Sequence, residues 1–588
     1  MITLNRIYSE TNLFTPVIFH SGINIILGKY SDGERSVNGI GKSTLVRLID
    51  FALLSSSKNL ITPKTKFLTD LNHSVSLEFK FNEVDYKITR LFRIPDEVIF
   101  GQLDADVVTY KIAEAKNILG SMFFEGADYP GGYYVNKWFR DLIKFFIKDD
   151  INNHKQYSPI NFVDYQATKT TLLTYNFYLL GLPNKSLYEL DIVQQDIRAK
   201  RTAKTEIKKQ IEQESGKDVS GLRTEIAKLN ERIVRIQDSV QEFTFVENYK
   251  DAELELEDIA RQISNKLQTY HSYNKTLEKY KESYSINLEV SISEVQALYK
   301  EIDSELANFV KKTLQDVVDF RSQIANNRKK FLADRERELK DAISKLIQEI
   351  TVLENKRKTL YSLIQEEGAF DSIKNAYESL ITEKVMYERD SAKLNQYLEA
   401  DASIANLNKR VSEISFSIIS DIRASQKTIN EIRLLYKDIL DSAIFVEEIT
   451  EEGYLDIKES STQNLPVDII VSVPKIKSLG KNRFGLLAYS LTVFLNLIYT
   501  RRDLPNFLIH DGVFHSIDKK TIVNTLNYLH QHVSTGLPFQ YIITGNDEEF
   551  NIPPEDVSTF GEYNFDFNKS VVATYQARPD QMIFGREF

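Results

Sequence analysis

The chain has 588 residues, which is too long for one compact core, so we expect two or more structural units. With 42% apolar and 27% charged residues it has the composition of an ordered soluble protein, and its net charge of −10 argues against a protein that coats nucleic acid uniformly. The absence of cysteine excludes disulfides, thiolate zinc sites and cysteine nucleophiles. The N-terminus shows no signal-peptide pattern and no apolar run long enough to span a bilayer is present, so we expect a cytoplasmic protein without membrane contact.

Residues 1–183 are expected to form a first α/β segment. Period-two alternation predicts two neighbouring strands joined by a hairpin turn at Asn82–Asp85. Helical spacing predicts two apolar helices, the second of which stops at Gly181-Leu182-Pro183. The expected strands are Ile2–Arg6, Pro16–His20, Ile23–Leu27, Ser74–Phe81 and Tyr86–Leu91, and the expected helices are Tyr133–Lys148 and Thr171–Leu180.

A glycine-rich loop, Asn38-Gly39-Ile40-Gly41-Lys42-Ser43-Thr44, stands between an apolar strand pattern and a segment with helical spacing. This order is the context of a phosphate-binding loop, in which backbone N–H groups and a helix N-terminus surround a phosphate. Lys42 is expected to reach the β- and γ-phosphates, and the Ser43 hydroxyl to ligate Mg²⁺. Ser36 occupies the place of the first glycine in the usual pattern, so the loop carries an insertion after Gly28, which closes the strand. The alternative is a chance Gly-Lys-Ser in a surface turn.

Residues 184–445 are expected to form a long antiparallel coiled-coil arm. No proline occurs between Pro183 and Pro466, and apolar residues recur at alternating steps of four and three, as in Leu222, Ile226, Leu229, Ile233, Ile236 and Val240. Because further strands follow, the coil must fold back as a hairpin, and we place its tip near residues 270–295. A bundle of ordinary amphipathic helices is the alternative.

Residues 446–588 are expected to form a second α/β segment. Asn506–Gly512 is predicted to be a buried strand that ends in Asp511, and Phe539–Asn546 to be a second strand with a polar end. The other expected elements are the strands Tyr454–Ile457 and Val467–Val473 and the apolar helix Phe484–Thr500.

A phosphate loop in one half, a strand-terminal aspartate in the other and a coil between them resemble the split ABC ATPase heads of the SMC and RecN families. The resemblance implies an α/β ABC-type head built from both ends of the chain, with ATP and Mg²⁺ as cofactors. Lys42 and Asp511, which match the Walker A lysine and the Walker B aspartate, would have the catalytic roles, and Ser43 and Asp511 would hold Mg²⁺. The implied ATP-binding residues in these motifs are Asn38, Gly39, Gly41, Lys42, Ser43, Thr44 and, at the D-loop position, Asp518.

The segment Ser478-Leu479-Gly480-Lys481-Asn482-Arg483 resembles a degenerate ABC signature. In the family the signature serine and glycine contact ATP bound on the opposite subunit, so the resemblance implies that Ser478 and Gly480 bind ATP in trans. It therefore implies a homodimer joined through ATP-sandwiched heads. The alternative is a basic loop that caps a helix.

Two positions depart from the family pattern. Gly512 follows Asp511, where the family has the glutamate that activates the attacking water, and glycine cannot act as a base. Gly545 and Asn546 stand near the place of the switch histidine. We therefore expect slow or DNA-gated hydrolysis, with ATP acting chiefly as a dimerising ligand, unless another residue substitutes.

Three residues are candidates for the missing roles. His515 and Glu548 could substitute for the base, although for His515 we favour a packing role in the D-loop. Gln166 is a candidate for the Q-loop glutamine.

Three stretches are similar to the SMC-like subunit of three-component antiphage systems, including those of Lamassu type. They are the inserted Walker A loop, the sequence Ile-His-Asp followed by a small residue, and Gln540-Tyr541-Ile542-Ile543-Thr544. This resemblance implies a sensor of double-stranded DNA ends or unusual structures, which controls a separate effector such as a nuclease and has a small accessory subunit. Phosphate contacts on the head and proximal coil would make such binding sensitive to salt. Candidate DNA contacts are Lys200, Arg201, Arg328, Lys329 and Lys330.

The alternatives to this function are a RecN-like repair ATPase, against which Gly512 argues, and a structural tether that holds ATP as a fixed ligand.

Overall fold

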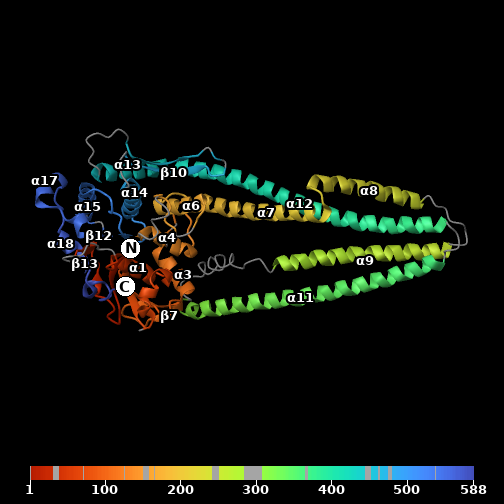
Figure 1. The fold of residues 1–588 in the computed structure, drawn as a ribbon, viewed down its shortest axis with the longest axis horizontal. Helices are drawn as coiled ribbons and strands as arrows, with labels where there is room; N and C mark the ends of the chain where they lie inside the picture. Colours follow the sequence, from red (N-terminus) through yellow and green to blue (C-terminus); the bar gives the residue numbers. More distant parts are fainter. Residues whose placement is uncertain are drawn as a thin grey trace. The chain divides into compact units, whose positions relative to one another are not determined.

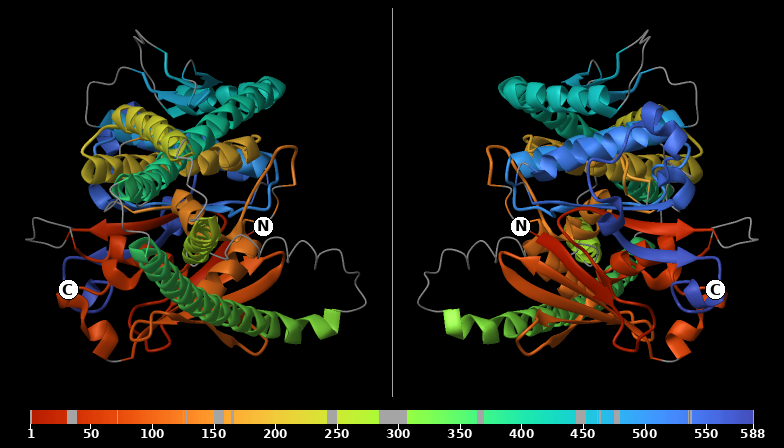
Figure 2. Two further views of the ribbon diagram at one scale, coloured as in Figure 1. Left: turned by 90° about the vertical axis from the view of Figure 1, so that its right-hand side faces the viewer. Right: turned by 90° about the vertical axis from the view of Figure 1, so that its left-hand side faces the viewer.

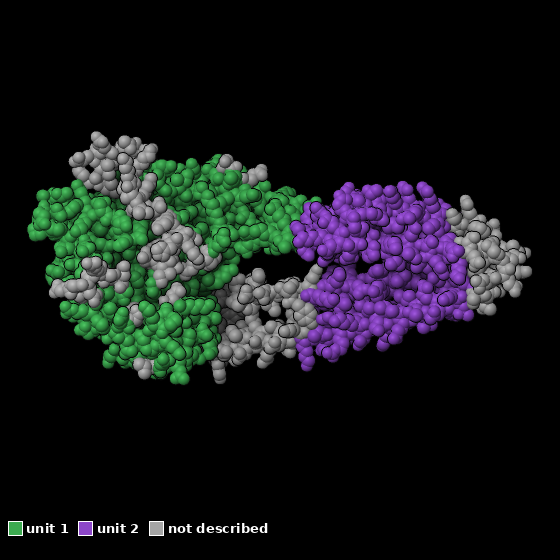
Figure 3. Space-filling model, viewed as in Figure 1, with its two compact units in different colours: residues 1–203, 400–588 green, residues 204–399 purple. Residues whose placement is uncertain are grey.

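The computed structural model describes residues 2–30, 39–70, 72–124, 126, 128–149, 158–163, 166–241, 250–283, 307–363, 369–443, 452–460, 462, 464–474, 480–534, 536 and 538–587. They divide into a head unit, residues 1–203 and 400–588, and a helical unit, residues 204–399 (Figure 3). The helical unit is shorter than the arm expected at 184–445. The reason is that Leu190 of helix α7 (Lys185–Ser215) and Ile418 of helix α12 (Ala369–Ala424) are buried in the apolar core of the head.

A parallel five-stranded sheet lies at the centre of the head unit and joins the two ends of the chain. Its order is β13-β3-β12-β11-β8, with bounds Gly22–Lys29 for β3, Ile147–Lys148 for β8, Phe507–His510 for β11, Gln540–Asn546 for β12 and Val571–Gln576 for β13. The N-terminal strand β3 pairs with the C-terminal strands β12 and β13 on its two sides. Red N-terminal and blue C-terminal strands therefore lie side by side in Figure 2. Strand β3 is apolar and almost wholly buried, as expected for a strand covered on both faces.

A second sheet of the head unit is antiparallel and contains only N-terminal strands, in the order β2-β1-β4-β5-β6-β7. Its members are β1 (Ile2–Tyr8), β2 (Val17–Ile18), β4 (Ser74–Phe81), β5 (Val84–Leu91), β6 (Glu97–Gln102) and β7 (Val108–Lys111). The expected hairpin is present, and its turn is confined to Asn82 and Glu83, both of which have positive φ. This conformation matches the twist of a two-residue hairpin.

Helices surround the two sheets of the head unit. Helix α6 (Lys169–Leu180) ends before Gly181, as the sequence predicts. The helix expected at Tyr133–Lys148 is shorter, since α4 covers Phe139–Phe146. On its N-terminal side Asn136–Trp138 form a 3₁₀ turn, and on its C-terminal side Ile147 and Lys148 pair with β11 as the edge strand β8. The other helices of the head unit are α1 (Lys42–Ala52), α2 (Phe67–Asp70), α3 (Ile112–Phe123), α13 (Gln426–Ala443), α14 (Gly480–Tyr499), α15 (Lys519–Ser534), α16 (Asp547–Phe550), α17 (Val557–Phe560) and α18 (Phe567–Ser570). The head also contains a two-stranded sheet, β9 (Tyr454–Glu459) with β10 (Val467–Ser472), and the short 3₁₀ turns Ser57–Asn59, Pro63–Thr65, Asn136–Trp138, Pro554–Asp556 and Pro579–Gln581.

The helical unit consists of the distal parts of α7 and α12 together with α8 (Val219–Gln241), α9 (Lys250–Ser283) and α11 (Ala307–Leu363). Helices α9 and α11 are antiparallel, since Glu255 pairs with Lys356 at 3.1 Å and Lys266 with Glu349 at 2.5 Å. The apolar heptad positions face inward: Leu222 on α8 packs with Ile211 and Leu394. The unit is thus an antiparallel assembly of helices, as the heptads predict.

Residues 270–283 of the tip expected near residues 270–295 continue helix α9, which ends at Ser283. His271 in this stretch lies 3.1 Å from Glu388 of α12, so the segment packs along other helices and is not a turn. Figure 1 shows α8 and α9 running in opposite directions, and likewise α11 and α12. Residues 284–295 lie outside the described residues. Heptads specify which face of a helix is buried, but they do not specify where a coil reverses.

The fold class expected from the sequence is confirmed by this topology: an α/β head assembled from N- and C-terminal halves, with an antiparallel coiled-coil arm inserted between them. Among the described residues, none of the helices combines the length and the apolar character needed to cross a bilayer.

Candidate nucleotide-binding site

The glycine-rich loop leads from β3 into the N-terminus of α1, as the sequence predicts. Gly41 is the N-cap of α1 with φ 118°, a conformation that L side chains rarely adopt. A Cβ at this position would also come within 2.4 Å of the Ile583 side chain, so the C-terminal segment packs directly on the loop. Lys42 is the first residue of the helix, and its backbone therefore lies at the positive end of the helix dipole.

The Lys42 side chain reaches across to the last residue of β12. Its Nζ donates a hydrogen bond to Asn546 Oδ1 at 2.7 Å. Gly28 makes this path possible, because a Cβ there would lie 2.6 Å from Lys42 Nζ. Burial lowers the pKa of Lys42, although the negative charges of Glu549 and Asp511 act in the opposite direction. A partly buried ammonium at the end of the loop is suited to bind an anion.

Asp511 follows β11 at the carboxyl end of the parallel sheet. Its backbone N–H donates to the Lys148 carbonyl at 2.8 Å, which continues the pairing with β8. Its carboxylate accepts a hydrogen bond from Thr544 Oγ1 at 2.5 Å, and Thr544 in turn accepts one from the Gly512 N–H at 2.9 Å. The side chain is thereby oriented by a residue of the neighbouring strand β12, and Asp511 is only 2% exposed.

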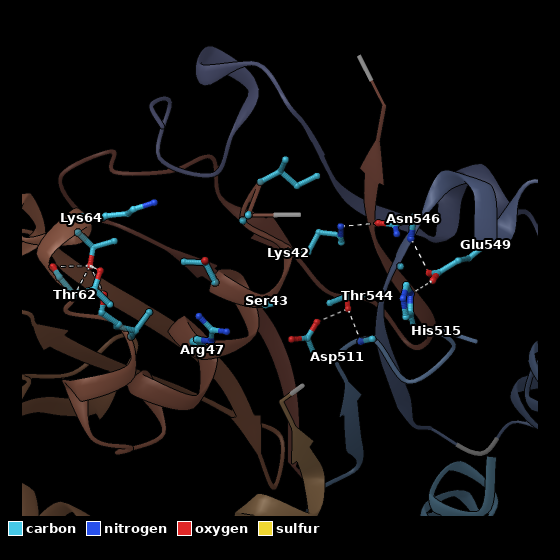
Figure 4. Close-up of a pocket in the computed structure, with 18 of the residues that line it drawn as sticks. Lys42, Ser43, Arg47, Thr62, Lys64, Asp511, His515, Thr544, Asn546 and Glu549 are labelled. Carbon is cyan, nitrogen blue, oxygen red and sulfur yellow. Dashed lines mark hydrogen bonds and ion pairs between the residues drawn. The ribbon is translucent and has the colours of Figure 1, made fainter. Parts of the chain in front are cut away.

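A cavity of about 680 Å³ lies between the loop and the ends of β11 and β12. It brings together six of the predicted site residues, namely Gly39, Gly41, Lys42, Ser43, Thr44 and Asp511 (Figure 4). Ser43 and Asp511 contribute a hydroxyl and a carboxylate, and such oxygen donors suit Mg²⁺, which proteins hold with one or two carboxylates plus the phosphates of the substrate. The donor set therefore fits the expected ATP and Mg²⁺.

Four predicted residues are not placed in this cavity. Asn38 and Ser478 lie outside the described residues. Gly480 is the first residue of α14, and its expected contact with a second subunit stays a prediction. Asp518 does not line the cavity: its carboxylate accepts hydrogen bonds from the Thr521 N–H at 2.8 Å and Thr521 Oγ1 at 2.7 Å, which caps α15. The expected contact of Asp518 with ATP stays a prediction.

The two weaker candidates also lie elsewhere. Gln166 lines a different cavity, beside Trp138 and Tyr188, so the structure does not place it at the nucleotide site. Glu548 does not line the cavity either, and it accepts a hydrogen bond from Tyr30 at 3.4 Å.

Several lining residues were not predicted. Arg483 donates to the carbonyls of Gly512 at 3.0 Å and of His515 at 3.2 Å. Glu549 accepts hydrogen bonds from His515 and from the Asn546 backbone. The remaining unpredicted residues of the cavity are Ile40, Arg47, Leu60, Thr62, Lys64, Thr65, Thr544 and Gly545. The polar end of the strand at Phe539–Asn546 was the one feature of the sequence that could have indicated further lining residues, because the carboxyl ends of neighbouring parallel strands meet at the same edge of a sheet.

Comparisons with known proteins give one family model, one relative and two solved structures that are similar to this chain. A model of the family described as "Uncharacterised protein conserved in bacteria (DUF2326)" matches residues 435–588. The "Uncharacterized protein YydD" of Bacillus subtilis (strain 168) is 20% identical in an alignment of 567 residues that covers 90% of this chain and 90% of that protein. The family match spans the part of the chain that supplies Asp511, Thr544 and Asn546 to the cavity.

Two solved structures are similar over nearly the whole chain. One is the Smc head domain with a coiled coil and joint from Pyrococcus yayanosii, at 13% identity, a TM-score of 0.34 and 92% coverage of both chains. The other is the Smc head domain with an extended coiled coil, bound to the C-terminal domain of ScpA, from Pyrococcus furiosus, at 12% identity, a TM-score of 0.34 and coverage of 93% of this chain and 91% of that one.

Proposed function

We propose that this chain is the SMC-like, ATP- and Mg²⁺-binding subunit of a bacterial antiphage defence complex of Lamassu type. The observation that carries the proposal is the position of Lys42. Its ammonium group lies at the carboxyl ends of β3 and β12, in a cavity that it shares with Ser43 and Asp511. A lysine at a helix N-terminus, a hydroxyl and a strand-terminal carboxylate are the groups that a nucleoside triphosphate with Mg²⁺ requires.

In this proposal ATP joins the heads of two copies into a homodimer. Ser478 and Gly480 of one copy contact the ATP held by Lys42 of the other, and the dimer senses double-stranded DNA ends or unusual structures. The DNA-sensing role, the nuclease effector and the small accessory subunit rest on the resemblance of the sequence. The split head supports a link between ATP binding and the helical unit, because both ends of the chain meet in one sheet and helices α7 and α12 extend from the head unit into the helical unit.

Head dimerisation tests the nucleotide site. Light scattering of the full chain should show an ATP- and Mg²⁺-dependent dimer, and Lys42→Ala should abolish it because the β- and γ-phosphates lose their cation. Lys58→Ala is the matched control: Lys58 is exposed in the turn Ser57–Asn59 and does not line the cavity, so dimerisation should persist. Unchanged dimer formation by Lys42→Ala would show that the head assignment is wrong.

Turnover of ATP with and without linear double-stranded DNA tests the sensing role. Stimulation by DNA supports a sensor, whereas fast basal turnover that DNA does not change favours a RecN-like repair ATPase. If the protein binds ATP but DNA changes neither turnover nor dimerisation, the structural tether is the better description.

A further inference from the structure

The cavity lacks a base at the position where one is expected. Gly512 follows Asp511, and a glycine cannot take a proton from water. Apart from Asp511, which is assigned to Mg²⁺, two residues that line the cavity have side chains of the types that serve as general bases, His515 and Glu549. These two side chains contact each other.

His515 and Glu549 form a hydrogen-bonded pair. His515 Nδ1 lies 2.9 Å from Glu549 Oε1, and the second oxygen of Glu549 accepts the backbone N–H of Asn546 at 2.9 Å. The carboxylate is therefore held at both oxygens, and its side chain is only 18% exposed. A carboxylate acceptor at Nδ1 favours the tautomer with the proton on Nδ1, which leaves Nε2 as the nitrogen that can accept a proton.

The two residues come from separate segments that the fold fixes close to the phosphate-binding lysine. His515 follows β11 in a turn, and its own backbone N–H donates a hydrogen bond to the Gly512 carbonyl at 3.2 Å. Arg483 donates hydrogen bonds to the carbonyl oxygens of both Gly512 and His515. Glu549 lies on α16, directly after β12, and Asn546 at the start of that helix also accepts the hydrogen bond from Lys42. The pair is thus connected through Asn546 to the group that would bind the γ-phosphate, as Figure 4 shows.

Exposure distinguishes the roles of the two residues. The His515 side chain is 63% exposed, so water has access to its ring, whereas Glu549 is mostly covered. The packing role favoured for His515 from the sequence is the alternative that the test below decides. An exposed imidazole that a covered carboxylate orients is the arrangement of a general base with its positioning residue.

We propose that His515 is the general base for ATP hydrolysis and that Glu549 is its positioning residue; this inference rests on the proposed binding of ATP and Mg²⁺. Water attacks the γ-phosphorus, the new O–P bond forms, and the bond from that phosphorus to the β–γ bridging oxygen breaks. One proton of the water passes to His515 Nε2, and Glu549 stabilises the imidazolium. ADP and phosphate leave, and the imidazolium returns its proton to solvent.

The test measures phosphate release by the full chain, with linear double-stranded DNA present, in parallel with the affinity for a fluorescent ATP analogue. His515→Ala should lower kcat about 100-fold, a typical contribution of a general base, while affinity changes little. Glu549→Gln should lower kcat less and move the acidic limb of the pH–rate profile to lower pH, since the imidazolium loses its carboxylate. A merely structural ion pair would not move that limb.

A matched control exists in the helical unit. His271 and Glu388 form a similar pair at 3.1 Å, with side chains 55% and 57% exposed. His271→Ala should leave kcat unchanged. Turnover of His515→Ala equal to that of the unaltered protein, or an unmoved acidic limb in Glu549→Gln, would overturn the assignment of the corresponding residue.

The outcomes also separate this inference from the proposed function. If the unaltered protein binds the analogue through Lys42 but releases no phosphate with or without DNA, the base assignment is wrong and the nucleotide site stands. If the unaltered protein does not bind the analogue at all, both are wrong.

Discussion

Replacing Lys148 with methionine should stabilise the head unit at neutral pH. Lys148 is the last residue of β8 and is only 8% exposed, and its Nζ has no hydrogen-bond partner among the described residues. Its ammonium group lies 5.1 Å from the centre of the Phe145 ring. Burial lowers the pKa of His510 well below its ordinary value, and the positive charge of Lys148 acts in the same direction. The neighbouring His510 therefore contributes no charge at neutral pH.

The size of this stabilisation follows from the pKa of the Lys148 side chain. Burial lowers the pKa of Lys148 from 10.5 to about 7. As the pH falls from 10.5 towards 7, the unfolded chain gains a proton that the folded chain does not, so the free energy of unfolding decreases by about 1.4 kcal/mol per pH unit. The full effect, on the order of 5 kcal/mol, is present at pH 7 and below. Lys148→Met removes this term, so its advantage over the unaltered protein should be largest at pH 7 or below and should vanish near pH 10.5.

Urea unfolding followed by tryptophan fluorescence is a suitable assay, because Trp138 is the one tryptophan of the sequence and lies in the head unit. The difference in unfolding free energy between Lys148→Met and the unaltered protein should be measured from pH 6 to pH 10. Lys144→Met is the matched control: this buried lysine bonds Asp50 at 3.0 Å, so its loss should destabilise the head. A Lys148→Met protein that is no more stable at pH 7, or whose advantage does not shrink at higher pH, would refute the reasoning.

Three glycine substitutions test the backbone around the cavity. Gly28→Ala should weaken binding of an ATP analogue about tenfold or more with little change in unfolding temperature, because its Cβ displaces the Lys42 ammonium while the surrounding backbone stays in place. Gly41→Ala should lower the free energy of unfolding by about 1–3 kcal/mol, measured by urea unfolding, because it combines a strained φ with a clash against Ile583. Gly512→Glu should fail to raise kcat and should cost about 1–2 kcal/mol of stability, since φ at this position is 64°.

The sequence was sufficient for the residues whose roles follow from local pattern. Gly41 and Lys42 lie between a buried strand and a helix, and Asp511 ends a buried apolar run, so both halves of the site could be placed by reading neighbouring residues. The split of the head into two ends of the chain also followed, because a coil interrupts two α/β patterns.

Contacts between distant segments could not be predicted in this way. Lys42 and Asn546 are 504 positions apart, and no local pattern states that an amide at the end of one strand will accept a hydrogen bond from that lysine. Lys148 was assigned to a helix because Leu142, Ile143 and Phe146 have helical spacing, but pairing with β11 made the last two residues of that pattern a strand. Tertiary pairing overrode local propensity there.

The backbone at Gly512 connects the missing glutamate with the His515–Glu549 pair. Because Gly512 has φ 64° and its N–H bonds Thr544, the chain leaves the strand direction immediately after Asp511. The same turn brings the His515 N–H to the Gly512 carbonyl and His515 Nδ1 to Glu549. A glutamate that continued the strand would need an extended backbone, and an extended backbone would remove the turn that holds His515. With the backbone of Gly512 in this conformation, the base that we propose comes from His515, which the turn places beside Glu549.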